Sequence, residues 1–178
     1  MPLNRRQLIG SLAVASLNAL APQFARAQDA TLAKKIPSSG EALSIVGLGS
    51  WITFNVGDDP VARDSSTEVM RAFFNAGGRM IDSSPMYGSA QEVIGYCLRK
   101  TGKAGNVFAT DKVWIAKGDE GPEQIERSGA LWGVDRFDLL QVHNLVAWEA
   151  HLDTLNAMKD DGKLRYVGST TSHGRRHD

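Results

Sequence analysis

The sequence is poor in cysteine and has no excess of charge of either sign. Cys97 is the only cysteine among 178 residues, so the chain forms no internal disulfide. Its 20 basic and 20 acidic residues cancel, which argues against a surface that attracts nucleic acid or anionic membrane. The balanced apolar and charged fractions are typical of one globular domain rather than of a disordered or fibrous chain. Composition alone assigns no function.

Acidic residues are absent from the first 27 positions. This segment begins with a basic patch at Arg5 and Arg6, continues with an apolar run over 8–21, and ends in Ala25-Arg26-Ala27. That order is typical of a signal peptide. The run is shorter than the roughly 20 apolar residues that span a bilayer, so we expect no membrane anchor after cleavage.

The first arginines also indicate the export route. Asn4-Arg5-Arg6-Gln7-Leu8-Ile9 resembles the twin-arginine motif, so we expect residues 1–27 to direct residues 28–178 to the periplasm or otherwise out of the cell. Ordinary secretory export is the first alternative. The second is a helix of the fold, which is disfavoured because apolar residues surround the segment instead of recurring at helical spacing. Removing three arginines from the 20 basic residues leaves 17 against 20 acidic residues, a formal charge of −3.

The spacing of histidines and cysteine does not indicate a metal site. The four histidines show no metal-ligand spacing with one another or with Cys97, and they are His143, His151, His173 and His177. Cys97 shares an i, i+4 spacing with Val93, which predicts that it lies on the buried face of a helix. We expect His151 on an exposed helix face.

From residue 32 onward, short apolar runs alternate with segments of helical periodicity, as in βα units that build a parallel sheet. A β-hairpin is expected first, with strands at 31–36 and 42–45 around Pro37-Ser38-Ser39-Gly40. Strands are then predicted at 46–51, 79–82, 107–112, 137–143 and 164–168. Helices are predicted between them at 66–75, 90–100, 122–132 and 148–160. The pattern fits both a doubly wound sheet and the start of a (β/α)8 barrel.

Titratable side chains lie at the ends of three predicted strands. Asp82, Lys112 and His143 end the second, third and fourth strands, and Tyr87 follows Asp82 by five residues. Because the C-terminal ends of parallel strands open on one face, we expect these four groups to converge. Singly, each has an ordinary explanation as a cap, a loop residue, a solvated lysine or a core histidine. Together, the carboxylate, the ammonium and the phenol provide one another with partners and with a chemical use.

These residues resemble a known catalytic set. Asp82-Ser83-Ser84-Pro85-Met86-Tyr87-Gly88, with Lys112 and His143 downstream, is similar to the Asp/Tyr/Lys/His tetrad of the aldo/keto reductases. The similarity extends through Gly47-Leu48-Gly49-Ser50-Trp51, Glu92-Val93-Ile94-Gly95 and 137–143. It implies a (β/α)8 TIM barrel, here with about the first five βα units after a hairpin that closes the bottom. It also implies an NAD(P)H-dependent oxidoreductase that reduces small aldehydes or ketones to alcohols.

The resemblance gives each member of the tetrad a role that its chemistry supports. Tyr87 would act as the general acid that protonates the alkoxide left by hydride transfer. Lys112, held by Asp82, would lower the pKa of the Tyr87 phenol from its usual value of about 10. His143, as a neutral imidazole, would donate a hydrogen bond to the substrate oxygen.

The resemblance also implies a nicotinamide cofactor, NADP or NAD, with NADP favoured by the resemblance only. The expected contacts end the first and second predicted strands and include two threonines where the family has a Ser-Asn pair: Gly49, Ser50, Trp51, Asp82, Thr170 and Thr171. Two other dehydrogenase types do not fit. Gly47-Leu48-Gly49 lacks the third glycine of a Rossmann fingerprint, and no lysine follows Tyr87 by four residues, as it does in short-chain dehydrogenases.

The length of the chain suggests three states. The family's remaining strands would lie beyond Asp178, so we expect a shortened copy of an exported reductase whose open sheet edges favour self-association. The alternatives are a half-barrel that dimerises into a working assembly and a non-catalytic binding module that retains the barrel scaffold. Gly129 is a further departure from the family pattern, because it replaces a large apolar residue and costs about 1 kcal/mol of helix propensity relative to alanine.

Overall fold

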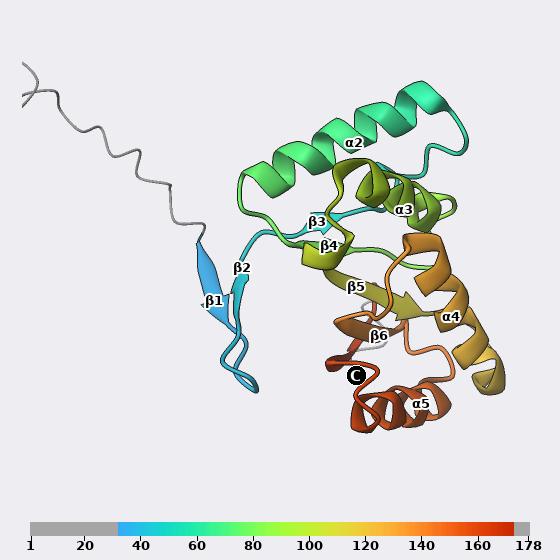
Figure 1. Cartoon of the computed structure of the whole chain (residues 1–178). Helices are drawn as coiled ribbons and strands as arrows, with labels where there is room; N and C mark the ends of the chain where they lie inside the picture. Colours follow the sequence, from blue (N-terminus) through green and yellow to red (C-terminus); the bar gives the residue numbers. More distant parts are fainter. Residues whose placement is uncertain (1–31, 173–178) are drawn as a thin grey trace, which may run out of the picture. The chain divides into compact units, whose positions relative to one another are not determined.

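The computed structural model describes residues 32–172, which form a five-stranded parallel sheet, four α-helices and a separate two-stranded hairpin (Figure 1). The predicted signal peptide, residues 1–27, lies outside the described residues, as do His173 and His177 near the C-terminus. The architecture is the α/β class that the sequence predicts.

The order of the strands distinguishes between the two α/β architectures. Each strand of the sheet lies beside the next one in sequence, in the order β3-β4-β5-β6-β7, and all neighbours are parallel. The strands are β3 Leu48–Gly49, β4 Met80–Asp82, β5 Phe108–Val113, β6 Leu139–His143 and β7 Tyr166–Thr170. A doubly wound sheet reverses its order at a switch point, whereas a (β/α)8 barrel does not. The sheet is therefore consistent with part of a TIM barrel.

The helices alternate with the strands and lie on one side of the sheet (Figure 1). They are α2 Pro60–Asn75, α3 Ala90–Thr101, α4 Gly121–Trp132 and α5 Trp148–Asp160, with short 3-10 helices η1 Ala104–Asn106 and η2 Gly118–Glu120 in two connections. Apolar side chains between the sheet and the helices form one core, which includes Met70, Ile81, Ile94, Leu98, Trp132 and Leu140. Burial of this face holds the strand ends in a fixed arrangement.

Several boundaries differ from the sequence prediction: β3 and β6 are shorter than predicted, β7 is shifted by two residues, and α2 is longer. Helix α2 begins at Pro60 rather than at residue 66, because the Asp59 carboxylate accepts hydrogen bonds from the backbone N–H groups of Val61 and Ala62. An acidic N-cap followed by proline is a strong signal for a helix start. The predicted start was later because the apolar periodicity begins only after the first helical turn. Strand β7 ends at Thr170 instead of residue 168.

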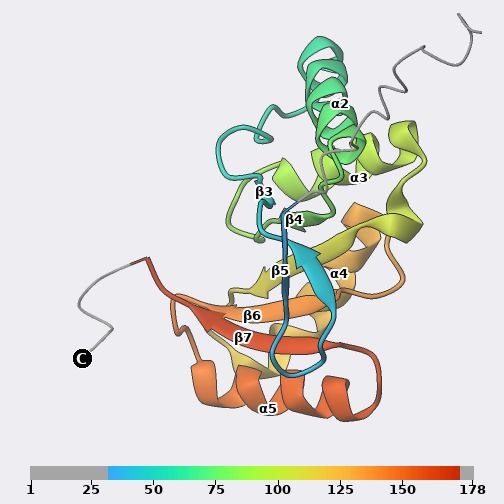
Figure 2. The same cartoon turned by 90° about the vertical axis from the view of Figure 1, so that its left-hand side faces the viewer.

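The hairpin packs at the end of the sheet away from the predicted tetrad. Strands β1 Ala33–Lys35 and β2 Ala42–Ser44 pair antiparallel, as predicted. Arg165, just before β7, forms ion pairs with Glu41 of the hairpin turn and with Asp138, the latter at 2.6 Å. Tyr166 donates a hydrogen bond to Glu41 at 2.9 Å. The hairpin is therefore fixed at the N-terminal end of β7 (Figure 2).

Two predictions about single helix residues can be checked. Cys97 is fully buried on α3, as predicted. The prediction for His151 is wrong, because its side chain is fully buried and its Nε2 lies 2.8 Å from the carbonyl oxygen of Ile115. His151 shares the i, i+4 spacing of the buried Leu155, so the helical period already indicated its burial.

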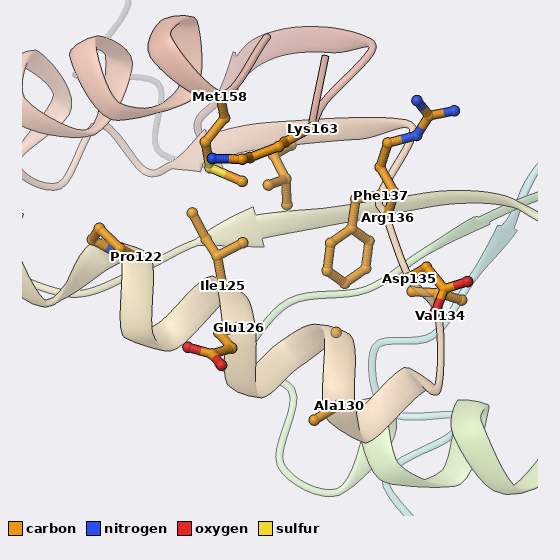
Figure 3. A pocket seen from close by; sticks show the side chains of 12 residues that line it. Pro122, Ile125, Glu126, Ala130, Val134, Asp135, Arg136, Phe137, Met158 and Lys163 are labelled. Carbon is orange, nitrogen blue, oxygen red and sulfur yellow. The ribbon is translucent and has the colours of Figure 1, made fainter. Parts of the chain in front are cut away.

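A groove of about 700 Å³ runs between α4 and α5 on the helix side of the sheet. Ile125, Phe137 and Met158 point into it (Figure 3), and Gly129 lines it. The groove contains no member of the tetrad. Within residues 32–172 no helix is long and apolar enough to cross a membrane, and no group of three or more His, Cys, Asp or Glu residues could hold a metal ion.

Candidate active site

The acidic and basic members of the tetrad form an ion pair at the C-terminal ends of β4 and β5. Lys112 Nζ donates hydrogen bonds to Asp82 Oδ2 at 2.6 Å and to the carbonyl oxygen of Ser83 at 2.7 Å. The Lys112 side chain is 5% exposed and that of Asp82 is 34% exposed. A buried ammonium is costly unless charged and polar partners compensate for its lost hydration. Asp82 and Ser83 provide these partners and fix the position of the ammonium.

Tyr87 and His143 complete the cluster. The Lys112 ammonium lies 5.2 Å from the centroid of the Tyr87 ring, and the His143 ring meets that ring edge-on with centroids 6.1 Å apart. Trp51, which follows β3, also lies near Tyr87, with ring centroids 6.4 Å apart. The structure therefore brings Asp82, Tyr87, Lys112 and His143 together, as the strand-end argument predicts.

A tight loop between β4 and α3 holds Tyr87 in place. The backbone N–H of Tyr87 donates to the Ser84 carbonyl oxygen at 3.0 Å, and Gly88 then turns the chain at φ +60°. A Cβ at Gly88 would lie 2.3 Å from Asn55 Oδ1, which itself accepts hydrogen bonds from the Ser89 backbone and hydroxyl groups. Both the left-handed backbone and the close approach of Asn55 require glycine here.

The acidity of Tyr87 differs from the sequence prediction. Burial, followed by the negative charges of Asp82 and Asp111, raises the pKa of the Tyr87 phenol above 10. The prediction that Lys112 lowers the pKa of Tyr87 is wrong, since the ammonium directs its hydrogen bonds to Asp82 and Ser83. At neutral pH Tyr87 therefore carries its proton and is a donor.

His143 is neutral at physiological pH. Burial, and secondarily the positive charge of Lys112, lowers the pKa of its imidazole to about 4. Its Nδ1 is buried and has no hydrogen-bond partner within residues 32–172. A neutral imidazole carries its proton on one nitrogen. A proton on Nε2 makes that nitrogen a hydrogen-bond donor, as the sequence analysis expects.

The segment after β6 contains a polar residue that the sequence analysis overlooked. Asn144 and Leu145 both have φ of +55°, and Ala147 has φ of +44°. The Asn144 Oδ1 accepts hydrogen bonds from the Ser172 backbone at 3.0 Å and from its hydroxyl group at 3.1 Å. Left-handed non-glycine residues cost free energy and concentrate at functional sites. Asparagine tolerates this conformation. An asparagine directly after the tetrad histidine was therefore the feature of the sequence that could have indicated a functional turn at Asn144.

The predicted cofactor contacts flank the tetrad on two strands. Gly49 ends β3 in register with Asp82, and the buried Ser50 donates its backbone N–H to the Asp82 carbonyl oxygen at 3.1 Å. Trp51 follows and is 65% exposed. On the other side, Thr170 ends β7 in register with His143, and Thr171 comes next. The structure thus places all six predicted residues at the same end of the sheet.

The chemistry of these residues fits part of a nicotinamide cofactor. The Ser50 hydroxyl is buried without a partner inside residues 32–172. Thr170 and Thr171 are half-buried residues with hydroxyl side chains, and Trp51 is exposed. Neutral donors and a flat apolar face suit the carboxamide and ring of nicotinamide. The six residues include no cation, so phosphate groups would need other partners.

Residues 45–175 match the Aldo/keto reductase family. Aldo-keto reductase YhdN of Bacillus subtilis (strain 168) is 28% identical over 148 residues, covering 75% of this chain and 45% of the relative. Methylglyoxal reductase YeaE of Escherichia coli (strain K12) is 32% identical over 142 residues, covering 76% of this chain and 48% of the relative. The chain thus spans about half the length of the curated relatives it matches.

Solved structures show the same fold. An aldo-keto reductase from Klebsiella pneumoniae in complex with NADPH superposes with a TM-score of 0.66 at 22% identity, covering 81% of this chain and 51% of that one. The holo form of an aldo-keto reductase from Bacillus halodurans gives 0.68 at 18% identity, covering 83% and 52%. At these identities the similarities show the fold alone.

Proposed function

Because this chain belongs to the aldo/keto reductase family, we propose that it reduces a small aldehyde or ketone with a nicotinamide cofactor, with Tyr87 as the proton donor. The observation that carries the proposal is the cluster itself. Lys112 binds Asp82 at 2.6 Å and lies 5.2 Å from the Tyr87 ring centroid, and the His143 ring meets the Tyr87 ring edge-on. These are the groups that carbonyl reduction needs, at one end of one sheet.

The proposed cofactor is NADPH. The structural neighbour from Klebsiella pneumoniae was solved with NADPH, and the residues beside this tetrad fit the nicotinamide end of such a molecule. When bound, the cofactor supplies the hydride that adds to the carbonyl carbon. Ser50, Thr170 and Thr171 would hold the carboxamide, and Trp51 would cover the ring.

The chain's own residues would manage the charge that hydride addition creates. Tyr87, which keeps its proton at neutral pH, would transfer it to the new alkoxide oxygen. The phenolate left behind would be stabilised by the Lys112 ammonium, which Asp82 holds in place. His143, neutral because of its burial, would donate a hydrogen bond that orients the carbonyl before the proton moves.

The proposed substrates are small and carry a reactive carbonyl group. The Escherichia coli relative is a methylglyoxal reductase, which makes methylglyoxal the first compound to assay. The exposed aromatic ring of Trp51 borders the cluster and would shield the carbonyl from water.

Replacing Tyr87 by phenylalanine tests the proposal. We expect Tyr87→Phe to lower methylglyoxal-dependent oxidation of NADPH by at least about 100-fold, because general acid catalysis contributes 10²–10⁴, while NADPH binding stays unchanged. Loss of NADPH absorbance measures turnover, and energy transfer from tryptophan to NADPH measures binding. Tyr96→Phe is the matched control, since Tyr96 lies on α3 and bonds to Asp64 instead. Undiminished turnover in Tyr87→Phe refutes the role of Tyr87.

We also propose that residues 1–27 direct export by the twin-arginine route, on the strength of Arg5 and Arg6 before the apolar run. A reporter fused to residues 1–30 should reach the periplasm of a wild-type host and remain in the cytoplasm of a host without the twin-arginine translocase. Arg5→Lys together with Arg6→Lys should block export in the wild-type host. Export in the translocase-deficient host would contradict the proposed route.

A further inference from the structure

A second carboxyl group lies next to Lys112 on the opposite face of the sheet. Side chains alternate between the two faces of a strand. Lys112 and Thr110 of β5 face Asp82, whereas Asp111 points toward the helix layer beside its cross-strand neighbour Leu140. Asp111 is fully buried in the region that holds the apolar core. A carboxyl group in such a place requires compensating partners.

One neutral side chain of α3 and one backbone N–H provide these partners. Asp111 Oδ2 accepts a hydrogen bond from Gln91 Nε2 of α3 at 2.8 Å, and Oδ1 accepts from the Lys112 backbone N–H at 2.8 Å. Gln91 Nε2 also donates to Ser128 Oγ of α4 at 2.9 Å. The carboxyl group thus connects the Lys112 backbone to α3 and α4. Its partners satisfy both oxygens without neutralising a charge.

The charged groups that act on Asp111 all belong to the candidate active site. The helices contribute only the neutral Gln91 and Ser128. Burial raises the pKa of the Asp111 carboxyl to about 7, with Lys112 opposing the rise and Asp82 adding to it. In return, an ionised Asp111 raises the pKa of the Tyr87 phenol, after burial and Asp82. Asp111 and Tyr87 are therefore electrostatically coupled across β5.

We propose that Asp111 is a positioning residue that acts through Lys112 and adjusts proton transfer at Tyr87. The inference rests on the proposed function. The hydrogen bond from the Lys112 backbone fixes the end of β5, and the charge of Asp111 determines how far the ammonium can stabilise a phenolate. With Asp111 protonated, Asp82, which Lys112 binds, is the one remaining negative charge that raises the pKa of the Tyr87 phenol. With Asp111 ionised, a second negative charge opposes the phenolate, so proton donation becomes harder as the pH rises through neutrality.

The coupling can be measured without cofactor or substrate by carbon NMR of the ring carbon that carries the hydroxyl group. The chain has three tyrosines, and Tyr87→Phe identifies the Tyr87 signal. In the unmodified chain we expect this signal to inflect near pH 7, as Asp111 ionises, and to move again when the phenol ionises. In Asp111→Asn, which keeps the oxygen facing the Lys112 N–H and removes the charge, the first inflection should vanish. The phenol should then ionise several tenths of a pH unit lower.

Two control variants separate charge from packing. Ser128→Ala disturbs the network without changing charge, and Asp135→Asn removes an exposed carboxylate elsewhere, so both should leave the Tyr87 titration unchanged. A Tyr87 signal without an inflection near pH 7 in the unmodified chain overturns the proposal, even if Asp111→Asn fails to fold. An equal phenol titration in folded Asp111→Asn overturns it as well. Because no turnover is measured, an inactive chain contradicts the proposed function alone.

Discussion

Burial determines the protonation state of three titratable residues around the sheet's C-terminal end. It keeps Tyr87 protonated, His143 neutral and Asp111 protonated up to about neutral pH. Each shift disfavours a charge that has lost its water. The ion pair of Lys112 and Asp82, at 2.6 Å, lies among these groups.

His143 and Asp111 should have opposite effects on the pH dependence of stability. The pKa of His143 falls from 6.5 to about 4 on folding, so its contribution to stability is lost as the pH falls below 6.5. The pKa of Asp111 rises from 3.8 to about 7, so its contribution is lost as the pH rises from about 4 to 7. Between pH 5 and 6 the folded and unfolded states differ by nearly one proton at each residue, in opposite directions, so the two effects on stability cancel.

Single substitutions should reveal the separate effects of His143 and Asp111 on stability. From pH 5 to pH 6, the free energy of unfolding of Asp111→Asn should rise by about 1 kcal/mol relative to that of the unmodified chain. That of His143→Gln should fall by about the same amount. Urea unfolding at the two pH values measures both changes. If the free energy of unfolding changed equally with pH in the unmodified chain and in both variants, His143 and Asp111 would have ordinary pKa values.

The position of the tetrad could be predicted from the sequence, but its electrostatics could not. Asp82, Lys112 and His143 each end a predicted strand, and strand ends of a parallel sheet share one edge. The pKa of Tyr87 depends on where the Lys112 hydrogen bonds go, which spacing does not determine. Asp111 adjoins Lys112 in sequence, yet its burial became evident only once β5 was covered by α3 and α4.

Among the helices, glycines at two interior positions have opposite consequences. A Cβ at Gly129 of α4 would lie 3.6 Å from the Val134 carbonyl oxygen and 3.9 Å from the Phe137 ring, which are ordinary contacts beside the groove of Figure 3. Gly129→Ala should therefore stabilise the chain by about 1 kcal/mol. A Cβ at Gly95 of α3 would lie 2.0 Å from the Leu131 carbonyl oxygen.

Gly95→Ala is the matched control. It raises helix propensity by the same amount, but its new methyl group would clash with the Leu131 carbonyl oxygen. We expect it to destabilise the chain enough to separate α3 from α4, and thermal unfolding followed by circular dichroism compares the two variants. A lower melting temperature for Gly129→Ala than for the unmodified chain would mean that the groove beside α4 does not accommodate a methyl group.

The elements were predictable where a local signal and the apolar period agreed. Helix α3 has both a helical apolar pattern and Gly102 in a left-handed C-cap, and its observed bounds nearly match the prediction. Helix α2 starts six residues earlier than its apolar pattern indicates, since Asp59 and Pro60 determine the start. The prediction for His151 is wrong because the Ile115 carbonyl oxygen satisfies its Nε2 and so permits burial of a polar ring.

For the molecule as a whole, the sheet is best protected in its centre. Within residues 32–172, β5 has a strand on each side and is buried throughout, whereas β3 and β7 have one neighbouring strand each. Unpaired strand edges are sites of local opening and of association with other chains. In the described part of the fold we therefore expect β5, which carries Lys112, to open least often and the edge strands β3 and β7 to open most often.

Hydrogen exchange should follow this order. We expect amides of 108–113 to exchange most slowly and those of 48–49 and 166–170 to exchange faster, because edge strands open without unfolding of the core. Mass spectrometry of peptides from the exchanging protein measures this at several protein concentrations. Protection of an edge strand that rises with concentration would indicate self-association through that edge. Equal protection of all five strands would contradict a rigid centre with open borders.

Transfer of deuterium from labelled NADPH to a carbonyl compound tests the proposed reductase chemistry most directly. The purified chain is mixed with NADPH deuterated at the transferred position and with methylglyoxal, and the alcohol is analysed by mass spectrometry. We expect one deuterium in the product from the unmodified chain and from Tyr96→Phe, and none above background from Tyr87→Phe. Unlabelled alcohol, no alcohol, or equal labelling by Tyr87→Phe would contradict carbonyl reduction with Tyr87 as the acid.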